Sequence, residues 1–285
     1  MSDAQVVAGL SRLAALLGDG HTNLNPLQTA GNLHQYPLRV KWFADGLFVT
    51  AVGPATKGLM GRKVISVGGI ETEALFQQLK PFVSFENEAW AREMSQSLLT
   101  SPEMLAAAGA AVDSGATVWE LEDATGNRES STLQIGGTVT IDGPHLARPG
   151  NPMYRRNPTL PYWFGPVEGT GILYFKYLRC EESPALSMEQ FTRDFAEYLK
   201  TRPSSRVVFD LRDNTGGNTQ WLDSMLAYLM SAFLRGEILA PVEGFYAIVG
   251  RRTFSSAAIH AARLRDIGFV MVGEPTGGNP SSFGE

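Results

Sequence analysis

The chain has 285 residues, of which 44% are hydrophobic and 19% are charged, and its formal net charge at pH 7 is -5. This composition is typical of a globular protein with a sizeable core, and the acidic balance argues against a nucleic-acid-binding surface. The single cysteine, Cys180, excludes an internal disulfide, and no apolar stretch is long enough to span a membrane. The first residues lack the charged and apolar regions of a signal peptide.

The first 34 residues predict a helix followed by a polar loop. Apolar residues recur at three- and four-residue steps from Val6 to Leu17, which is the period of an amphipathic helix. Gly18 and Gly20 end this helix, since glycine is common just past a helix end. His21 follows, and we expect it either to be a solvated loop residue or to act as a base on a fixed loop.

Residues 35–141 predict a compact α+β region. Two strands surround the turn at Asp45-Gly46, a dipeptide that favours a tight hairpin. A strand at 63–67 ends at two glycines. The other expected elements are helices at 71–79, 87–99 and 102–111, and a second hairpin from 117 to 135.

The pattern changes after this region. Residues 142–170 are rich in Pro, Gly and Arg without periodicity, so we expect a linker or a loop that lines a site. In residues 171–285 strands alternate with helices, which indicates an α/β domain with a parallel sheet, and sites in such domains assemble at the carboxyl ends of the strands. The expected strands are 172–177, 207–211, 245–249 and 269–273, and the expected helices are 188–201, 219–233 and 255–267.

Two serines lie where the third of these strands passes into a helix. Ser255 and Ser256 are expected beside free backbone N–H groups and the positive end of the helix dipole. An acyl-transfer enzyme places its nucleophile there, because the same N–H groups can hold an oxyanion. The alternative is that either serine only caps the helix.

Glycine-rich loops follow two of the other strands. Gly216 and Gly217 permit close approach of the backbone to a ligand, so their N–H groups are candidates for half of an oxyanion hole, although a simple turn is the alternative. Asp210 and Arg212, just before them, predict a charge pair that fixes the loop. The second loop runs from Gly273 to Gly278.

Four motifs occur in order between residues 19 and 278. They are Asp19-Gly-His-Thr22, Asp210-Leu-Arg-Asp-Asn-Thr-Gly-Gly217, Thr253-Phe-Ser-Ser-Ala257 and Gly273-Glu-Pro-Thr-Gly-Gly278. In this order they resemble the tail-specific (C-terminal-processing) serine protease family, which includes the tricorn protease core. Residues 61–69 also resemble the PDZ-like domain that often precedes the catalytic part of this family.

The resemblance implies a catalytic domain of the ClpP/crotonase type, with a parallel sheet and helices, after a smaller α+β region. It implies Ser255 as the nucleophile, because Ser255 aligns with the family's catalytic serine. It also implies oxyanion donors at the backbone N–H of Gly216 or Gly217 and of Ser256. No metal and no cofactor are implied, and the sequence contains neither zinc-like ligand spacing nor a Walker-type phosphate loop.

The chain departs from the family at the position of the base. Many members use a lysine after the Gly-Glu-Pro-Thr motif, but this chain has Asn279 there and no lysine from Phe254 to Glu285. The tricorn-like branch uses a histidine, and the resemblance implies that His21 takes this role as general base. His260 is the rival, since it lies one helical turn beyond Ser256.

The carboxylate that would orient the base has two candidates, Glu285 and Glu274. We prefer Glu285, because Glu274 stands next to Pro275 at a strand end, where it can fix the loop.

These inferences predict a serine peptidase that acts on peptides. The motif Gly-x-Ser-x-Gly is absent, which disfavours an ordinary α/β-hydrolase. Two alternatives stay open: an esterase that uses the same residues on small esters, and a non-catalytic relative that binds hydrophobic molecules near Trp163, Phe164 and Tyr154. The sequence does not indicate the oligomeric state, and only the family resemblance points to a secreted or envelope location.

Overall fold

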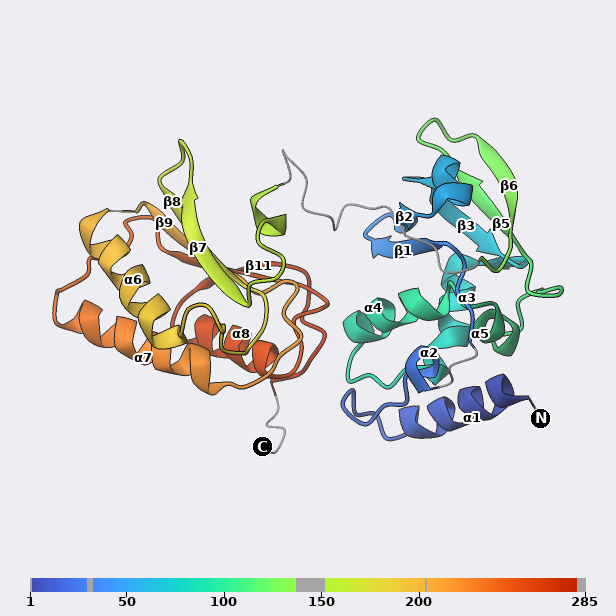
Figure 1. The fold of residues 1–285 in the computed structure, drawn as a ribbon, viewed down its shortest axis with the longest axis horizontal. Helices are drawn as coiled ribbons and strands as arrows, with labels where there is room; N and C mark the ends of the chain where they lie inside the picture. Colours follow the sequence, from blue (N-terminus) through green and yellow to red (C-terminus); the bar gives the residue numbers. More distant parts are fainter. Residues whose placement is uncertain (1, 30–32, 137–151, 203, 281–285) are drawn as a thin grey trace. The chain divides into compact units, whose positions relative to one another are not determined.

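The computed structural model describes residues 2–29, 33–136, 152–202 and 204–280. The chain folds into two compact units, Met1–Leu146 and Ala147–Glu285, each with its own sheet and its own core (Figure 1). The predicted N-terminal segment 1–34 therefore belongs to the same unit as the α+β region. No helix in the described ranges is long and apolar enough to cross a membrane.

An antiparallel sheet runs through the first unit in the order β1-β2-β3-β5-β6, and the short strand β4 pairs with β3. Both predicted hairpins are confirmed, the first around Asp45-Gly46 and the second between β5 and β6. Side chains of β1 alternate between buried and exposed, as expected for a sheet with one face on the core. The strands are β1 (Leu38–Phe43), β2 (Gly46–Val52), β3 (Lys63–Val67), β4 (Ile70–Glu71), β5 (Thr117–Glu122) and β6 (Arg128–Leu133).

Helices pack beneath this sheet, and α4 lies directly against β1 (Figure 1). The helix predicted at 102–111 ends early, at Ala107, because Gly109 adopts a left-handed conformation with φ +86°. The helices are α1 (Asp3–Ala15), α2 (Pro26–Thr29), α3 (Thr72–Leu79), α4 (Glu88–Leu98) and α5 (Pro102–Ala107), and the 3-10 turns are η1 (Pro54–Leu59) and η2 (Lys80–Phe82).

The N-terminal helix α1 presents its apolar stripe outward. Leu10, Leu13 and Leu17, which define the periodic pattern in the sequence, are 50%, 63% and 67% exposed. The buried side of α1 instead includes Val7 and Ser11, and the Ser11 hydroxyl donates a hydrogen bond of 2.9 Å to the Val7 carbonyl. The period correctly predicted the helix, but not which of its faces meets the core.

The second unit contains a mostly parallel sheet in the order β11-β10-β9-β8-β7. Strands β8 to β11 are parallel neighbours, as predicted, and β7 pairs antiparallel with β8 at the edge. The prediction of a loop throughout 142–170 is wrong, because 162–167 form β7. Pro166 obscured the strand pattern, and it is tolerated because β7 is an edge strand. The strands are β7 (Tyr162–Val167), β8 (Ile172–Tyr177), β9 (Arg206–Asp210), β10 (Phe245–Val249) and β11 (Val270–Gly273).

Aromatic side chains fill the core between this sheet and its helices. Phe175 and Phe209 are buried with their rings edge to face at 4.7 Å, and Phe191 and Phe195 pack on Phe175 from α6. The helices α6 and α7 lie side by side, and α8 contacts β10 (Figure 1). The remaining elements are η3 (Met153–Arg155), α6 (Met188–Thr201), α7 (Gln220–Leu234) and α8 (Ser256–Asp266).

Candidate active site

Ser255 lies in the turn that joins β10 to α8. Its backbone has φ +53° and ψ -131°, a conformation that is unusual and costly for a residue with a Cβ atom. Such strain persists only where the surrounding structure imposes it. Ser255 is partly exposed, and its hydroxyl does not cap the helix. Capping therefore does not explain this serine.

Glycines enclose Ser255 from two sides. A Cβ atom added to Gly216 would lie 2.7 Å from the Ser255 Cβ, and a Cβ atom added to Gly278 would lie 2.9 Å from the Ser255 nitrogen. Both distances are shorter than real Cβ contacts, so a side chain at either position would force the turn to move. The loops after β9 and β11 thus meet the serine turn after β10, as expected for the carboxyl ends of parallel strands.

Asn214 holds the glycine loop against the serine turn. This buried residue accepts the Phe254 N–H at its backbone carbonyl, at 3.1 Å, and the Gly216 N–H at its side-chain Oδ1, at 2.9 Å. Its Nδ2 donates to the Tyr177 carbonyl at 3.1 Å. The Asn214 side chain thereby connects the end of β8 to the loop after β9. The Asn214 backbone carbonyl binds Phe254, the residue before Ser255.

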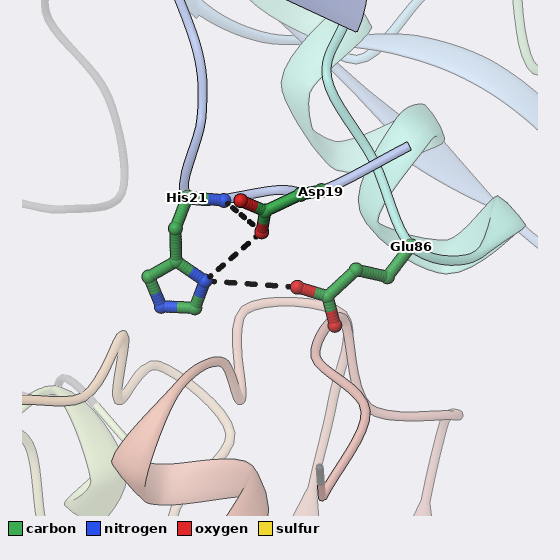
Figure 2. A group of neighbouring side chains, drawn as sticks. All are labelled: Asp19, His21 and Glu86. Carbon is green, nitrogen blue, oxygen red and sulfur yellow. Dashed lines mark hydrogen bonds and ion pairs between the residues drawn. The ribbon is translucent and has the colours of Figure 1, made fainter. Parts of the chain in front are cut away.

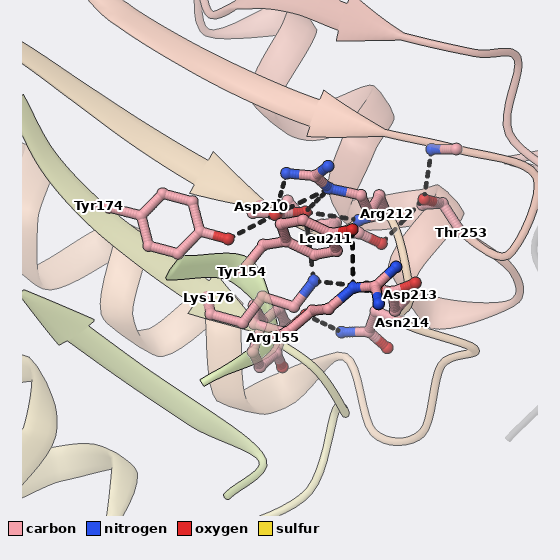
Figure 3. A network of polar contacts seen from close by, with 12 residues as sticks. Tyr154, Arg155, Tyr174, Lys176, Asp210, Leu211, Arg212, Asp213, Asn214 and Thr253 are labelled. Atoms are coloured by element: carbon pink, nitrogen blue, oxygen red, sulfur yellow. Dashed lines mark hydrogen bonds and ion pairs between the residues drawn. The ribbon is translucent and has the colours of Figure 1, made fainter. Parts of the chain in front are cut away.

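Thr253 connects the same loops from the other side (Figure 3). Its buried hydroxyl donates to the Leu211 carbonyl at 2.9 Å and accepts the Gly250 N–H at 3.0 Å. Its backbone carbonyl accepts the N–H groups of Gly277 and Gly278 at 3.0 and 3.2 Å. Hydrogen bonds with the loops after β9, β10 and β11 therefore impose the conformation of the serine turn.

The backbone N–H groups near Ser255 differ in what they already bind. The Gly216 N–H donates to Asn214, so this candidate oxyanion donor is engaged. Gly217 forms a parallel bridge with Cys180, in which the Cys180 N–H donates to the Gly216 carbonyl and the Cys180 carbonyl accepts from Asn218. In such a bridge the N–H of Gly217 points away from Cys180.

Ser256 is the first residue of α8, where backbone N–H groups have no partner within the helix. Its hydroxyl donates a hydrogen bond to the Gly217 carbonyl, so the Gly217 backbone faces the start of α8. The Gly217 carbonyl and the first residue of α8 are therefore direct neighbours.

A buried charge network supports the end of β9 (Figure 3). Asp210 accepts hydrogen bonds from the Tyr174 hydroxyl at 2.5 Å and from Arg212 Nε at 2.9 Å, and Lys176 Nζ lies 3.4 Å away. Burial raises the pKa of Asp210, but the Arg212 hydrogen bonds and the Lys176 charge outweigh this and hold the pKa below its ordinary value. The predicted charge pair of Asp210 and Arg212 is confirmed, and the buried Lys176, which also pairs with Asp213 at 2.8 Å, extends it.

His260 is a core residue. Its ring is fully buried, with Nε2 donating to the Thr219 carbonyl at 3.0 Å and Nδ1 lying 3.6 Å from Cys180 Sγ. Burial lowers the pKa of His260, so the ring is neutral at pH 7. Burial also raises the pKa of Cys180 to about 11, which makes its thiol unreactive. Because both nitrogens of His260 are engaged in the core, it is not placed to serve as the base.

His21 lies in the first unit, in the loop after α1 (Figure 2). Its Nδ1 is 3.6 Å from Asp19 Oδ1 and 3.6 Å from Glu86 Oε1, while Nε2 points away from both carboxylates. Asp19 shapes the loop, because its oxygens accept the His21 N–H at 3.0 Å and the Thr22 hydroxyl at 2.6 Å. These hydrogen bonds, led by that of Thr22, hold the pKa of Asp19 below its ordinary value.

Asp19, His21 and Glu86 also offer ligand atoms that lie within 4.8 Å of one another. One histidine with two carboxylates is a donor set that zinc accepts. However, both oxygens of Asp19 already accept hydrogen bonds from their own loop. We therefore interpret this group as a histidine with carboxylate partners.

The predicted site residues do not all lie together. The structure brings Ser255, Ser256 and the glycine loop together in the second unit, while His21 belongs to the first unit. Glu274 pairs with Arg251 at 2.7 Å, which agrees with a role in fixing its loop. Glu285 lies outside the described residues.

Sequence analysis did not identify several residues that support the candidate site. Asn214 and Thr253 stand inside two of the four sequence motifs, and that position was the available signal. Lys176 is hidden in an otherwise apolar strand, and Glu86 is far from His21 along the chain, so neither gave a usable pattern.

The side chains proposed to line a hydrophobic ligand cavity instead make contacts within the second unit. Phe164 packs against the rings of Phe191 and Phe195, at 5.4 and 5.1 Å, and Trp163 packs against Tyr174 at 5.5 Å. These contacts do not favour the ligand-binding alternative.

No protein-family model matches the sequence, and no curated protein matches it. Among solved structures, the chain is similar to mature CPAF in complex with lactacystin, with a TM-score of 0.62, 12% identity, and coverage of 98% of this chain and 76% of that chain. Mature CPAF gives a TM-score of 0.60 and 11% identity over 96% of this chain and 74% of that one. The tricorn protease aligns with 14% identity over 87% of this chain and 22% of that chain, but its TM-score of 0.28 does not establish a shared fold.

The likeness to CPAF shows a shared mixed α/β fold that contains both sheets. The ClpP/crotonase type of the second unit, the PDZ-like character of residues 61–69 and the tricorn-like branch stay predictions.

Proposed function

We propose that this protein is a serine hydrolase that cleaves peptide bonds through an acyl-enzyme on Ser255, with His21 as the general base. The backbone N–H groups of Gly217 and Ser256 hold the oxyanion. The reaction so written needs neither a metal nor a cofactor. Glu285, the carboxylate that the sequence favoured for the triad, lies outside the described residues.

The observation that carries this proposal is the strained backbone of Ser255 beside the glycine loop. Ser255 has φ +53° and does not cap its helix, and a backbone conformation this costly persists only where the surrounding structure imposes it. Nucleophilic serines are presented on such turns between a strand and a helix, where N–H groups are already aimed at the developing charge. The contacts of Asn214 and Thr253 pre-organise this arrangement.

The proposed chemistry follows from these groups. As Ser255 Oγ bonds to the substrate carbonyl carbon, its proton passes to the general base, for which we propose His21, and the carbonyl oxygen becomes an oxyanion at Gly217 and Ser256. The intermediate collapses, the C–N bond breaks, and the leaving amine takes the proton from His21. Water then attacks the acyl group in the same way and releases the acid, which restores Ser255.

We take a peptide as the substrate class, because the four sequence motifs resemble those of a serine protease family. Mature CPAF, whose fold this chain shares, is described in complex with lactacystin. An esterase would use the same residues, because the acyl-transfer groups do not themselves select the leaving group. No observation on the described residues favours an ester over a peptide.

Labelling with a fluorophosphonate probe tests the proposal. We expect the wild type to label, Ser255→Ala to lose labelling, and His21→Ala to label more slowly by roughly a hundredfold to ten-thousandfold. His34→Ala is the matched control, since His34 is also a loop histidine with a carboxylate partner, Glu103, at 2.6 Å.

Cleavage of a mixed peptide library, compared with hydrolysis of a short-chain ester, then distinguishes the two substrate classes. A wild-type protein that never labels would contradict the proposal, as would labelling that survives in Ser255→Ala.

A further inference from the structure

Glu86 lies beside His21 although the two are far apart in the sequence. The loop between η2 and α4 carries Glu86 to the Nδ1 side of the imidazole, with its side chain only 7% exposed (Figure 2). The next residue, Asn87, caps α4 by accepting the Trp90 N–H at 3.0 Å. The backbone beside Glu86 is therefore held by the start of a helix.

The other carboxylate near His21 has a different task. Asp19 uses both oxygens to accept hydrogen bonds within the Asp19–Thr22 loop, and its side chain is 39% exposed. Solvent screens the charge of Asp19 more than that of Glu86, because an interaction between charges strengthens as the surroundings become less polar. Glu86 is thus the better placed counter-charge for the ring.

We propose that Glu86 is the positioning residue for His21. Its carboxylate holds the proton on Nδ1, so Nε2 is the nitrogen that accepts a proton. This inference rests on the proposed function, in which His21 is the base. Once Nε2 is protonated the ring is a cation, and the ionised Glu86 stabilises it without taking the proton.

The distance between His21 and Glu86 supports an electrostatic contact. At 3.6 Å, the contact between Nδ1 and Oε1 is longer than a hydrogen bond and is an ion-pair distance. Catalytic hydrogen bonds are often long in free enzymes and shorten in the complex with substrate.

The tautomer of His21 tests this inference without requiring any hydrolase activity. Long-range ¹H–¹⁵N spectra show which ring nitrogen carries the proton, and His21→Gln assigns its signal among the four histidines. We expect Nδ1–H in the wild type and in Glu86→Gln, because the glutamine carbonyl can still accept that proton. We expect a shift toward Nε2–H in Glu86→Leu.

The rate of fluorophosphonate labelling provides the second readout. Glu86→Gln keeps the acceptor but removes the charge that stabilises the protonated ring, so labelling should slow by roughly tenfold to a hundredfold. Glu88→Gln is the matched control, since this carboxylate, two residues away, pairs with Lys80 at 2.5 Å, and its labelling rate should not change. Glu86→Gln is nearly isosteric and keeps the test decisive if Glu86→Leu does not fold.

The inference would be overturned if wild-type His21 carried its proton on Nε2. It would also be overturned if neither Glu86 variant changed the tautomer or the labelling rate. Slower labelling in Glu86→Gln together with a changed tautomer in Glu86→Leu would support it. A wild type that never labels contradicts the hydrolase proposal alone, and the tautomer still decides whether Glu86 orients His21.

Discussion

The hydroxyl of Ser256 donates a hydrogen bond to the carbonyl oxygen of Gly217. This contact joins the first residue of α8 to the glycine loop after β9, and it turns the Gly217 backbone toward the serine turn. The two adjacent serines therefore have different environments. Ser256 holds the loop with its hydroxyl, whereas Ser255 has the strained backbone and the partly exposed side chain.

Substitution of the two serines should consequently give different results. Ser255→Ala should abolish fluorophosphonate labelling and change the free energy of unfolding by less than about 0.5 kcal/mol. Ser256→Ala should keep measurable but slower labelling and lose about 1–2 kcal/mol, because the Gly217 carbonyl loses its partner. Labelling and denaturant unfolding of both variants check this, and the reverse pattern would assign the nucleophile to Ser256.

A methyl group at Gly216 should disable the serine turn. Gly216→Ala places a Cβ atom 2.7 Å from the Ser255 Cβ at a backbone φ of +109°, so we expect strongly reduced labelling together with lower stability. Gly268→Ala is the matched control, because Gly268 has φ +97° but open space around the added Cβ atom. The free energy of unfolding of Gly268→Ala should fall by about 1–2 kcal/mol, the cost of a left-handed backbone at a residue with a Cβ atom, and its labelling rate should not change. Equal labelling in the two variants would refute the proposed contact.

The buried carboxylate of Asp210 should be essential for the stability of the second unit. Asp210→Asn leaves the positive charges of Lys176 and Arg212 without their common partner, and breaking a buried pair in this way costs about 3–5 kcal/mol. Glu189→Gln removes an exposed pair with Arg193 and should cost less than about 1 kcal/mol. Denaturant unfolding curves of both variants measure the difference, and similar losses would show that burial does not strengthen the network.

Acid should weaken the protein partly through the same residue. The folded-state pKa of Asp210 lies below its unfolded value, which is about 3.9. Its contribution to stability is therefore present above that pH and is lost as the pH falls through the folded-state pKa. We expect the free energy of unfolding of the wild type to fall more steeply than that of Asp210→Asn below about pH 4. If the free energies of unfolding of the wild type and of Asp210→Asn fell equally steeply with pH, the prediction would be wrong.

The thiol of Cys180 should be inert in the folded protein. It is 1% exposed, and burial raises its pKa to about 11, so the reactive thiolate is scarce at neutral pH. A thiol reagent such as DTNB should detect no thiol in native protein and the single cysteine in denaturant. Rapid reaction of the native protein would show that Cys180 is accessible.

The local elements were largely predictable. The Asp45-Gly46 turn predicted its hairpin, and the alternation after residue 171 predicted parallel strands, because turn chemistry and side-chain periodicity act over a few residues. The edge strand at 162–167 was missed, since Pro166 is a signal against a strand unless the strand is at an edge. Whether it is at an edge depends on the whole sheet.

Only part of the candidate site could likewise be predicted from the sequence. The turn that carries Ser255 could be recognised from this serine and the paired glycines, because a serine between a strand and a helix is a local pattern. The neighbours of Gly216 and the carboxylate beside His21 could not be recognised from the sequence, because these groups come together from distant parts of the chain.

The sequence by itself determined which segments form strands and helices and which loops carry reactive groups, through periodicity, glycine placement and motif order. Only the tertiary structure decided that Ser256 binds Gly217 while Ser255 is strained, that His260 is a core residue, and that Glu86 meets His21. The physical reason is that propensity acts on neighbours in the chain. Burial, hydrogen-bond partners and charge pairing depend instead on which distant segments the packed sheets bring into contact.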